Sequence, residues 1–152
     1  MIPSFISRFV LVFSIICHSV TVSPAQNVTA DYQAITTTLM NYIDGTAKGE
    51  PEKVRSAFHP DFQLYSVNEY DSLKIRSGNA YINNIKPGER TERQGRIIAI
   101  DIENNAAMAK AEIAVPGWRI FTDYFLLLRY EGAWKIVQKS YTWRPWPVDP
   151  KK

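Results

Sequence analysis

The chain has 152 residues, of which 45% are hydrophobic and 12% aromatic, and its formal net charge is +3 at pH 7. This length and composition predict one domain with a substantial core. The largest basic cluster, residues 86–96, is interrupted by two glutamates, so the charge pattern argues against nucleic-acid binding. The only cysteine, Cys17, excludes an internal disulfide.

The first 25 residues have the layout of a secretory signal peptide. A single charge, Arg8, precedes the apolar run "FVLVFSIIC", and the polar stretch "HSVTVSPA" follows it. The run is too short to span a bilayer core of roughly 30 Å. Ser23 and Ala25 fit the small-residue rule for cleavage after Ala25. We therefore expect an exported protein, periplasmic or secreted, whose mature domain (26–152) has no cysteine and no membrane anchor.

Helical spacing dominates the first part of the mature chain. Apolar residues between positions 29 and 48 recur every three or four residues, and Gly49 is expected to end this helix. The apolar positions are Tyr32, Ile35, Leu39, Tyr42 and Ile43. A proline at its first position favours a second helix over 51–58. Ser77 is a suitable cap for a third helix over 78–86.

Alternating segments predict six strands, at 62–67, 73–77, 94–103, 106–115, 118–130 and 133–143. The first two form a hairpin and the last four a meander, because only short turns separate neighbours. The proline-rich tail, 144–152, is expected to stay outside the ladder. The predicted fold class is α+β. Three N-terminal helices pack on a strongly bent antiparallel sheet, which gives a cone with a pocket in its open mouth.

One predicted strand carries an acid in apolar surroundings, within "FTDYFLLL" (121–128). A buried carboxylate at Asp123 is costly unless it is paired, hydrogen-bonded or protonated. Strand alternation divides the segment between two faces. The inner face holds Phe121, Asp123, Phe125 and Leu127, and the outer face holds Tyr124, Leu126 and Leu128.

Both faces of this segment are apolar, whereas a sheet that covers helices needs only one apolar face. On the last strand, Trp134 and Ile136 alternate with Val137 and Tyr141 in the same way. An exposed apolar patch of this size is typical of a partner surface, so a homodimer packed sheet to sheet is expected. The alternative is a monomer in which the C-terminal tail covers the outer face.

Three motifs together resemble one superfamily over residues 32–143: "YIDGTAKGEPEKVRSAFHPDF", "IIAIDIENNAAMAKAEI" and "TDYFLLLRYEGAWKIVQKSY". The chain is similar to the nuclear-transport-factor-2-like (NTF2-like) superfamily, and within it to the small exported proteins called putative lumazine-binding or SnoaL-like. The resemblance implies the cone-shaped NTF2-like fold and a homodimer formed through the sheet. It does not imply lumazine binding or nuclear transport.

The superfamily includes ketosteroid isomerases, and the resemblance implies roles for two residues. Tyr42 and Asp123 match the tyrosine and the protonated aspartic acid that form an oxyanion hole in those enzymes. The place of the general-base aspartate falls at or near Ser66, and a serine cannot remove a proton unaided. Superfamily dehydratases use a histidine with aspartate and tyrosine, which implies His59 as a third catalytic candidate beside Tyr42 and Asp123.

Each of these candidates has a structural alternative. Asp123 could pair with Arg119 or Lys139 and only fix the strand register. His59 lies in "HPD", which is expected to end the second helix, where a histidine can cap carbonyl groups. Aromatic rings at strand ends could line the pocket and bind an aromatic or polycyclic molecule, or they could be core. The ligand-binding candidates are Tyr42, Ser66, Trp118, Asp123, Tyr141 and Trp143.

Three functions follow from the sequence. No metal-ligand cluster and no glycine-rich phosphate loop is present, so no cofactor is expected. The first hypothesis is an exported protein that binds a small molecule, and the missing base residue favours it. The second is a cofactor-free lyase or isomerase, with dehydratase and cyclase chemistry included. The third is a dimeric interaction or assembly domain.

Overall fold

The computed structural model describes residues 24–147 of the chain. The predicted signal peptide lies almost wholly outside the described residues, as does the end of the tail, 148–152. No helix in the described part is long and apolar enough to cross a membrane. The elements in order are α1 (Pro24–Lys48), α2 (Pro51–Ala57), β1 (Phe58–Val67), β2 (Leu73–Ser77), α3 (Gly78–Asn83), β3 (Gln94–Glu103), β4 (Ala106–Val115), β5 (Arg119–Tyr130) and β6 (Ala133–Pro145).

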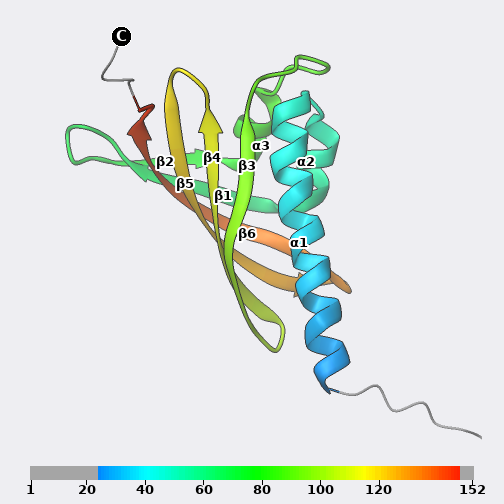
Figure 1. Ribbon diagram of the computed structural model, residues 1–152. Helices are drawn as coiled ribbons and strands as arrows, with labels where there is room; N and C mark the ends of the chain where they lie inside the picture. Colours follow the sequence, from blue (N-terminus) through cyan, green and yellow to red (C-terminus); the bar gives the residue numbers. More distant parts are fainter. Residues whose placement is uncertain (1–23, 148–152) are drawn as a thin grey trace, which may run out of the picture.

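The strands form one bent, mixed sheet in the order β2-β1-β6-β5-β4-β3 (Figure 1). The meander β3 to β6 is antiparallel as predicted. The expectation of a wholly antiparallel sheet is wrong at one pair, because β1 runs parallel to β6. The last strand of the meander therefore lies beside the first hairpin. This pairing joins the hairpin β1–β2 and the meander β3–β6 into one sheet.

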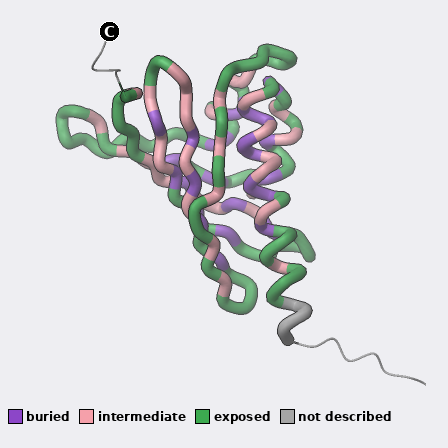
Figure 2. Tube along the Cα trace, viewed as in Figure 1, coloured by how far each residue is buried: buried purple, intermediate pink, exposed green. Residues whose placement is uncertain are grey.

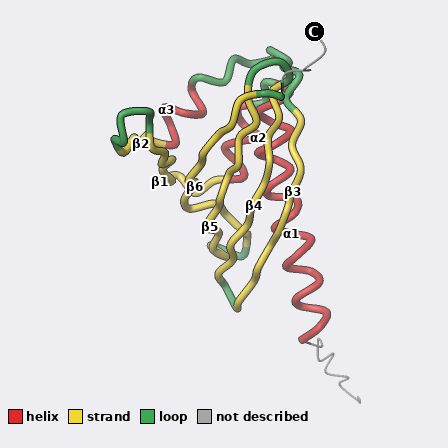
Figure 3. Tube along the Cα trace, turned by 60° about the vertical axis from the view of Figure 1, so that its left-hand side comes forward, coloured by secondary structure: helices red, strands yellow, loops and turns green. Residues whose placement is uncertain are grey.

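The helices cover one face of the sheet, and α1 runs along it (Figures 1 and 3). Buried residues concentrate where α1 and α2 meet the strands (Figure 2). The buried stripe of α1 includes Ile35, Leu39 and Tyr42, which is the spacing that the sequence predicts. On β4 the buried positions are small; they are Ala107, Ala109 and Ala111.

The helix ends follow local rules. Gly49 ends α1 with a φ of +65°, a left-handed conformation that glycine adopts without steric cost. Ser77 caps α3 as predicted, because its hydroxyl accepts a hydrogen bond from the Ala80 N–H at 3.2 Å. The helix α3 ends at Asn83, before the predicted end at Lys86.

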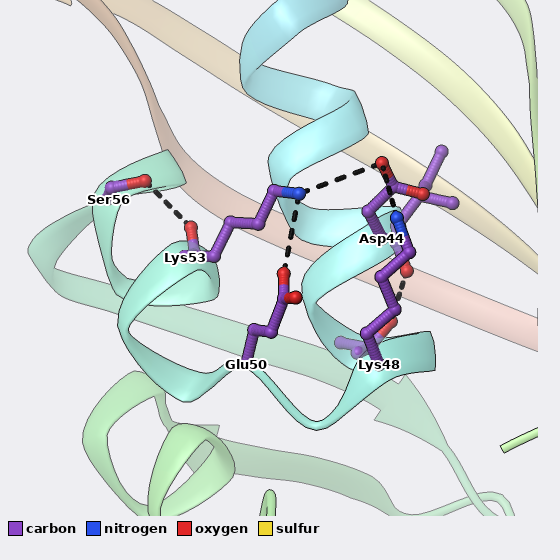
Figure 4. A network of polar contacts seen from close by, with 7 residues as sticks. Asp44, Lys48, Glu50, Lys53 and Ser56 are labelled. Carbon is purple, nitrogen blue, oxygen red and sulfur yellow. Dashed lines mark hydrogen bonds and ion pairs between the residues drawn. The ribbon is translucent and has the colours of Figure 1, made fainter. Parts of the chain in front are cut away.

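Charged side chains join α1 to α2 at the corner opposite the sheet (Figure 4). Lys53 lies 3.7 Å from Asp44 and 3.4 Å from Glu50, and Lys48 lies 3.5 Å from Asp44. These side chains are partly exposed, so each pair contributes at most about 1 kcal/mol. The corner is an ordinary solvated surface and takes no part in the site described below.

Two boundaries differ from the sequence prediction. The strand β1 begins at Phe58, directly after α2, so His59 lies in a strand and not in a helix-ending turn. The strand β6 extends to Pro145, which pairs with Arg119, so the first two residues of the tail join the ladder. Proline is tolerated there because it occupies the final pair, where its missing N–H interrupts no interior bond.

A bulge on β6 decides which of its side chains face inward. Leu127 pairs with Ile136 and Leu126 pairs with Gln138, so Val137 is an extra residue in the ladder. Simple alternation from Ile136 would place Tyr141 on the outer face, as predicted. The extra residue reverses the phase, and Tyr141 pairs with Asp123 on the inner face. The prediction for the outer face of this strand is therefore wrong beyond Val137.

On β5 the predicted alternation is confirmed. Its inner residues are buried, namely Asp123, Phe125 and Leu127. The outer residues Tyr124, Leu126 and Leu128 are 46%, 48% and 44% exposed, respectively. An apolar strip thus remains uncovered on the outer face of the described chain.

Candidate functional site

Three polar side chains form a closed triangle in the core. The Tyr42 hydroxyl donates to Asp123 Oδ2 at 2.7 Å. The Lys139 ammonium donates to the same oxygen and to Tyr42 Oη, both at 2.9 Å. All three side chains are buried. This arrangement satisfies the phenol and one carboxylate oxygen without water.

The triangle follows from strand register and helix packing. Asp123 lies on β5, and Lys139 pairs with Phe125, two positions further along that strand. Lys139 therefore reaches Asp123 diagonally across the ladder, a distance that a long side chain can span. The helix α1 supplies Tyr42, whose ring packs edge-on against Phe58 and Phe125 at 5.6 and 5.5 Å. Without the bulge on β6, Lys139 would face outward.

Electrostatics fix the roles within the triangle. Burial, and then the charge of Asp123, raise the pKa of Tyr42 well above its ordinary value, so the phenol stays neutral and donates. Asp123 and Lys139 form an ion pair at 2.9 Å. The predicted Tyr42–Asp123 hydrogen bond is thus confirmed, and the pairing of Asp123 with Lys139 exists beside it. Arg119, the other proposed partner, makes no ion pair with Asp123 among the described residues.

A cavity of about 770 Å³ opens beside the triangle, between the sheet and α3. This volume lies within the range of small-molecule sites, roughly 300–1,000 Å³. Asp123 and Lys139 reach its wall, whereas Tyr42 is not among the lining residues. The lining otherwise consists of Leu64, Ser66, Val67, Asn68, Glu69, Arg76, Tyr81, Thr91, Arg93, Val115, Trp118, Arg119, Phe121, Tyr141, Thr142 and Trp143.

The inner part of the cavity, which we call the floor, is formed by Asp123, Lys139, Tyr81 and Arg93. Two buried polar atoms there have no protein partner, Asp123 Oδ1 and Arg93 Nε. Burial lowers the pKa of Arg93, but Tyr42, Tyr81 and Asp123 outweigh it and raise that pKa, so the guanidinium stays charged. The residues of the floor therefore include one acceptor atom and one donor atom that lack a protein partner.

The outer part of the cavity, the mouth, is aromatic. The Arg119 guanidinium lies 4.6 Å from the Trp118 ring and 3.6 Å from the Trp143 ring. The Phe121 ring contacts Trp118 at 5.7 Å and Tyr141 at 6.2 Å between centroids. Trp118 and Trp143 remain 55% and 43% exposed, so these rings offer surface to a ligand.

The structure brings most of the candidate ligand-binding residues to one place. Ser66, Trp118, Asp123, Tyr141 and Trp143 line the cavity. Tyr42, the sixth candidate, lies behind Asp123 and reaches the cavity only through its hydrogen bonds.

His59 is not brought to this cavity. Its ring packs against Tyr130 at 4.9 Å, and its Nδ1 accepts a hydrogen bond from the Asp61 N–H at 3.2 Å. The structure therefore separates His59 from the lining residues and gives it local contacts.

Sequence reasoning missed two floor residues. Arg93 belongs to the basic cluster 86–96, which carries the charge pattern of a solvated surface. Tyr81 fits the apolar stripe of a short helix. Arg93 and Tyr81 differ from ordinary surface and core residues only because they line the cavity, and no local sequence pattern predicts that position. Lys139 was considered only as a structural partner for Asp123 and not as a residue of the cavity.

No group of three or more metal-ligating side chains occurs in the part of the chain that the structure describes. The floor offers a carboxylate, an ammonium, a guanidinium and a phenol, which together suit hydrogen bonding and proton transfer.

Several known proteins are similar to this chain over most of its length. A family model described as putative lumazine-binding matches residues 30–142. An aldolase, FrzH, from Cladobotryum sp. is 24% identical over 121 residues, which is 77% of this chain and 95% of that protein. An NTF2-like protein of unknown function from Shewanella baltica OS155 is 29% identical, with a TM-score of 0.69 over 78% of this chain and 97% of that one. Another, from Methylobacillus flagellatus KT, is 29% identical with a TM-score of 0.67, over 83% and 98%.

Proposed function

Because the chain belongs to the putative lumazine-binding family of NTF2-like proteins, we propose that it is an exported protein that binds a small molecule in its cavity. Family membership supports a ligand-binding protein. The observation that carries the proposal is the cavity of about 770 Å³, in which a polar floor faces an aromatic mouth. Sites for small molecules commonly combine apolar walls with a few convergent polar groups.

The mouth favours a flat ligand. Trp118, Trp143 and Phe121 present ring surfaces, and aromatic or polycyclic molecules stack on such surfaces with little loss of side-chain entropy. Ser66 and Thr142 add hydroxyl groups to the wall. A ligand that fills this space would contact the floor at one end and the rings at the other.

A thermal-shift screen of the protein against aromatic and polycyclic metabolites tests this proposal. A ligand of the cavity should raise the melting temperature, and Trp118→Ala should weaken its binding. Tyr124→Ala, on the outer face, is the matched control and should leave the affinity unchanged. If no compound stabilises the protein, or both variants weaken binding equally, the cavity is not the binding site.

Export is supported by the charge, the apolar run and the small residues at the start of the chain. Expression with the leader in a host with a secretion pathway should yield a protein that begins at Gln26. Mass spectrometry of the purified protein measures this directly, and an intact N-terminus would contradict export.

Catalysis is the second candidate, and the buried triangle beside the cavity favours it. A cofactor-free lyase would use Asp123 and Lys139, with Tyr42 behind them, to move protons and to stabilise an oxyanion. The similarity to an aldolase supports a carbon–carbon lyase as the reaction class. Cleavage of a fluorogenic β-hydroxyketone should then depend on Lys139, and Lys139→Gln should abolish it. Equal rates for the variant and the wild type would reject this candidate.

The outer face of β5 supports a homodimer, and with it the third function, an interaction or assembly domain. Tyr124, Leu126, Leu128 and Met108 are exposed together on this face. Light scattering should give twice the monomer mass at micromolar concentration, and Leu126→Lys should halve it. A wild-type protein with the mass of a monomer would contradict the dimer proposal.

A further inference from the structure

The charges of the cavity floor do not balance. Asp123 is already paired with Lys139, at 2.9 Å. Arg93 has no carboxylate within ion-pair distance among the described residues, although its Nε is buried. Arg93 is half-buried, and a partly desolvated cation without a counter-ion is unfavourable until something neutralises it.

The position of Arg93 is built into the fold. The segment that leads to β3 is tied to the end of α1, because the Thr91 N–H donates to the Ala47 carbonyl at 2.8 Å. The Thr91 hydroxyl then accepts from the Arg93 N–H at 3.4 Å. The side chain lines the cavity together with Tyr81. These bonds fix the backbone at Arg93, and its half-buried side chain lines the cavity.

We propose that the cavity binds an aromatic acid whose carboxylate pairs with Arg93 and whose hydroxyl or amino group donates to Asp123 Oδ1. This inference rests on the proposed binding function and specifies its ligand. It follows from the two buried polar atoms that lack a protein partner, one a donor and one an acceptor, both on the same floor. A ligand with only one of the two groups would leave the other atom unmatched.

Lys139 strengthens the same preference. Its ammonium group has three N–H donors, and the structure uses two of them, toward Tyr42 and Asp123. A carboxylate at Arg93 can accept the third. A guanidinium and an ammonium would then share the ligand's negative charge, and charge-assisted hydrogen bonds of this kind are the strong ones.

The mouth accounts for the aromatic part of the ligand. The Arg119 guanidinium lies over the Trp118 and Trp143 rings, so the wall there consists of planar groups. The aromatic ring of a ligand bound at the floor can stack on these side chains, and Arg119 can stay in place. The acid end is therefore inside and the ring end faces the opening.

Titration calorimetry with pairs of probes tests the inference. Each pair is an aromatic hydroxy acid, such as 2-hydroxybenzoate, and its methyl ester, which has the same shape without the charge. The wild type should bind at least one acid of the panel at least about tenfold more tightly than its ester. This comparison needs no variant, so it does not depend on the folding of a mutant.

The variant Arg93→Gln identifies the residue responsible. It should remove most of the preference for the acid and leave the affinity for the ester within about twofold. Arg90→Gln is the matched control, because Arg90 is exposed, lies outside the cavity and carries the same charge change. Arg93→Lys should retain part of the preference, since an ammonium keeps the charge but loses the fork geometry.

The possible outcomes distinguish the preference for an acid from the proposed small-molecule binding on which it rests. If neutral aromatic compounds bind in the cavity and no acid binds more tightly than its ester, the binding function stands and the acid inference is wrong. An acid preference that Arg93→Gln and Arg90→Gln leave equally intact also overturns it. If no compound of the panel binds, both proposals fail.

Discussion

The two ends of one ladder, β5 with β6, are built differently. At one end the inner side chains pack tightly beneath α1, and Phe125, Leu127, Trp134 and Ile136 are all buried. At the other end the inner side chains Phe121, Tyr141 and Trp143 line the cavity. The two strands are antiparallel in both halves, and the bulge at Val137 shifts their register by one residue between the halves. What differs is the cover, because the helix packs over one half only.

The polar triangle lies at the border between these halves. Tyr42 belongs to the packed side, and its ring contacts Phe58 and Phe125. Asp123 and Lys139 belong to both sides, since they bond to Tyr42 and also line the cavity. The comparison teaches that the charged groups of the site are held by the core, although they are presented to the cavity. Mutations on the two sides of this border should therefore have different costs.

Two phenylalanines on the same face of β5 give the largest contrast. Phe125→Ala should lower the free energy of unfolding by about 4 kcal/mol, because it leaves a hole in a packed core. Phe121→Ala should cost about 1 kcal/mol, because its space already adjoins the cavity. Denaturant unfolding of both variants measures this, and equal losses would mean that the cavity end is packed like the core.

At the border itself, Asp123→Asn should cost about 3 kcal/mol. The amide removes the counter-ion of Lys139 and leaves a buried ammonium unpaired. The double variant Asp123→Asn with Lys139→Met removes both charges and should recover part of the loss. If the single variant is as stable as wild type, the ion pair does not hold this part of the core.

The change Tyr42→Phe should cost less than Asp123→Asn, about 1–2 kcal/mol. It removes one hydrogen bond to the carboxylate and the oxygen that accepts from Lys139, but the ion pair remains. The reverse order, with Tyr42→Phe the more damaging, would indicate a neutral Asp123 that depends on the phenol. Parallel denaturant unfolding of the two variants decides the order.

The smallest effect is a dependence on alkaline pH. The pKa of Tyr42 is raised above 10.0 in the folded protein, by burial first and Asp123 second. The stabilisation from a raised pKa is complete below pH 10.0 and is lost as the pH rises toward the folded value, since only the unfolded chain then releases the proton. The slope of unfolding free energy against pH above 10.0 should be shallower in Tyr42→Phe than in Tyr70→Phe, an exposed control.

Local patterns predicted the parts of this protein that local forces determine. The strands over 94–103 and 106–115 have the predicted bounds, because alternation and a two-residue turn define both. The hydrogen bond between Tyr42 and Asp123 was predicted from an acid in an apolar strand and from a family resemblance. In both cases the information lies in the residues themselves.

The features that were missed depend on partners far away in the chain. The parallel pairing of β1 with β6 joins strands separated by the whole meander, and no local signal gives its direction. Arg93 lines the cavity in a segment that is held to the end of α1 by a backbone hydrogen bond. The bulge at Val137 exists only relative to β5, so the sequence of β6 alone does not reveal it.

The extra residue Val137 decides whether the odd-numbered or the even-numbered side chains of β6 face the cavity. Beyond Val137, the odd positions Lys139, Tyr141 and Trp143 face inward, while before it the even positions do. Removal of one residue there would turn Lys139 and Tyr141 outward and bring Gln138 and Ser140 to the inner face, without touching the core end of the strand. Relatives that differ by one residue at this point could thus share a scaffold and yet carry unrelated chemistry in the same cavity.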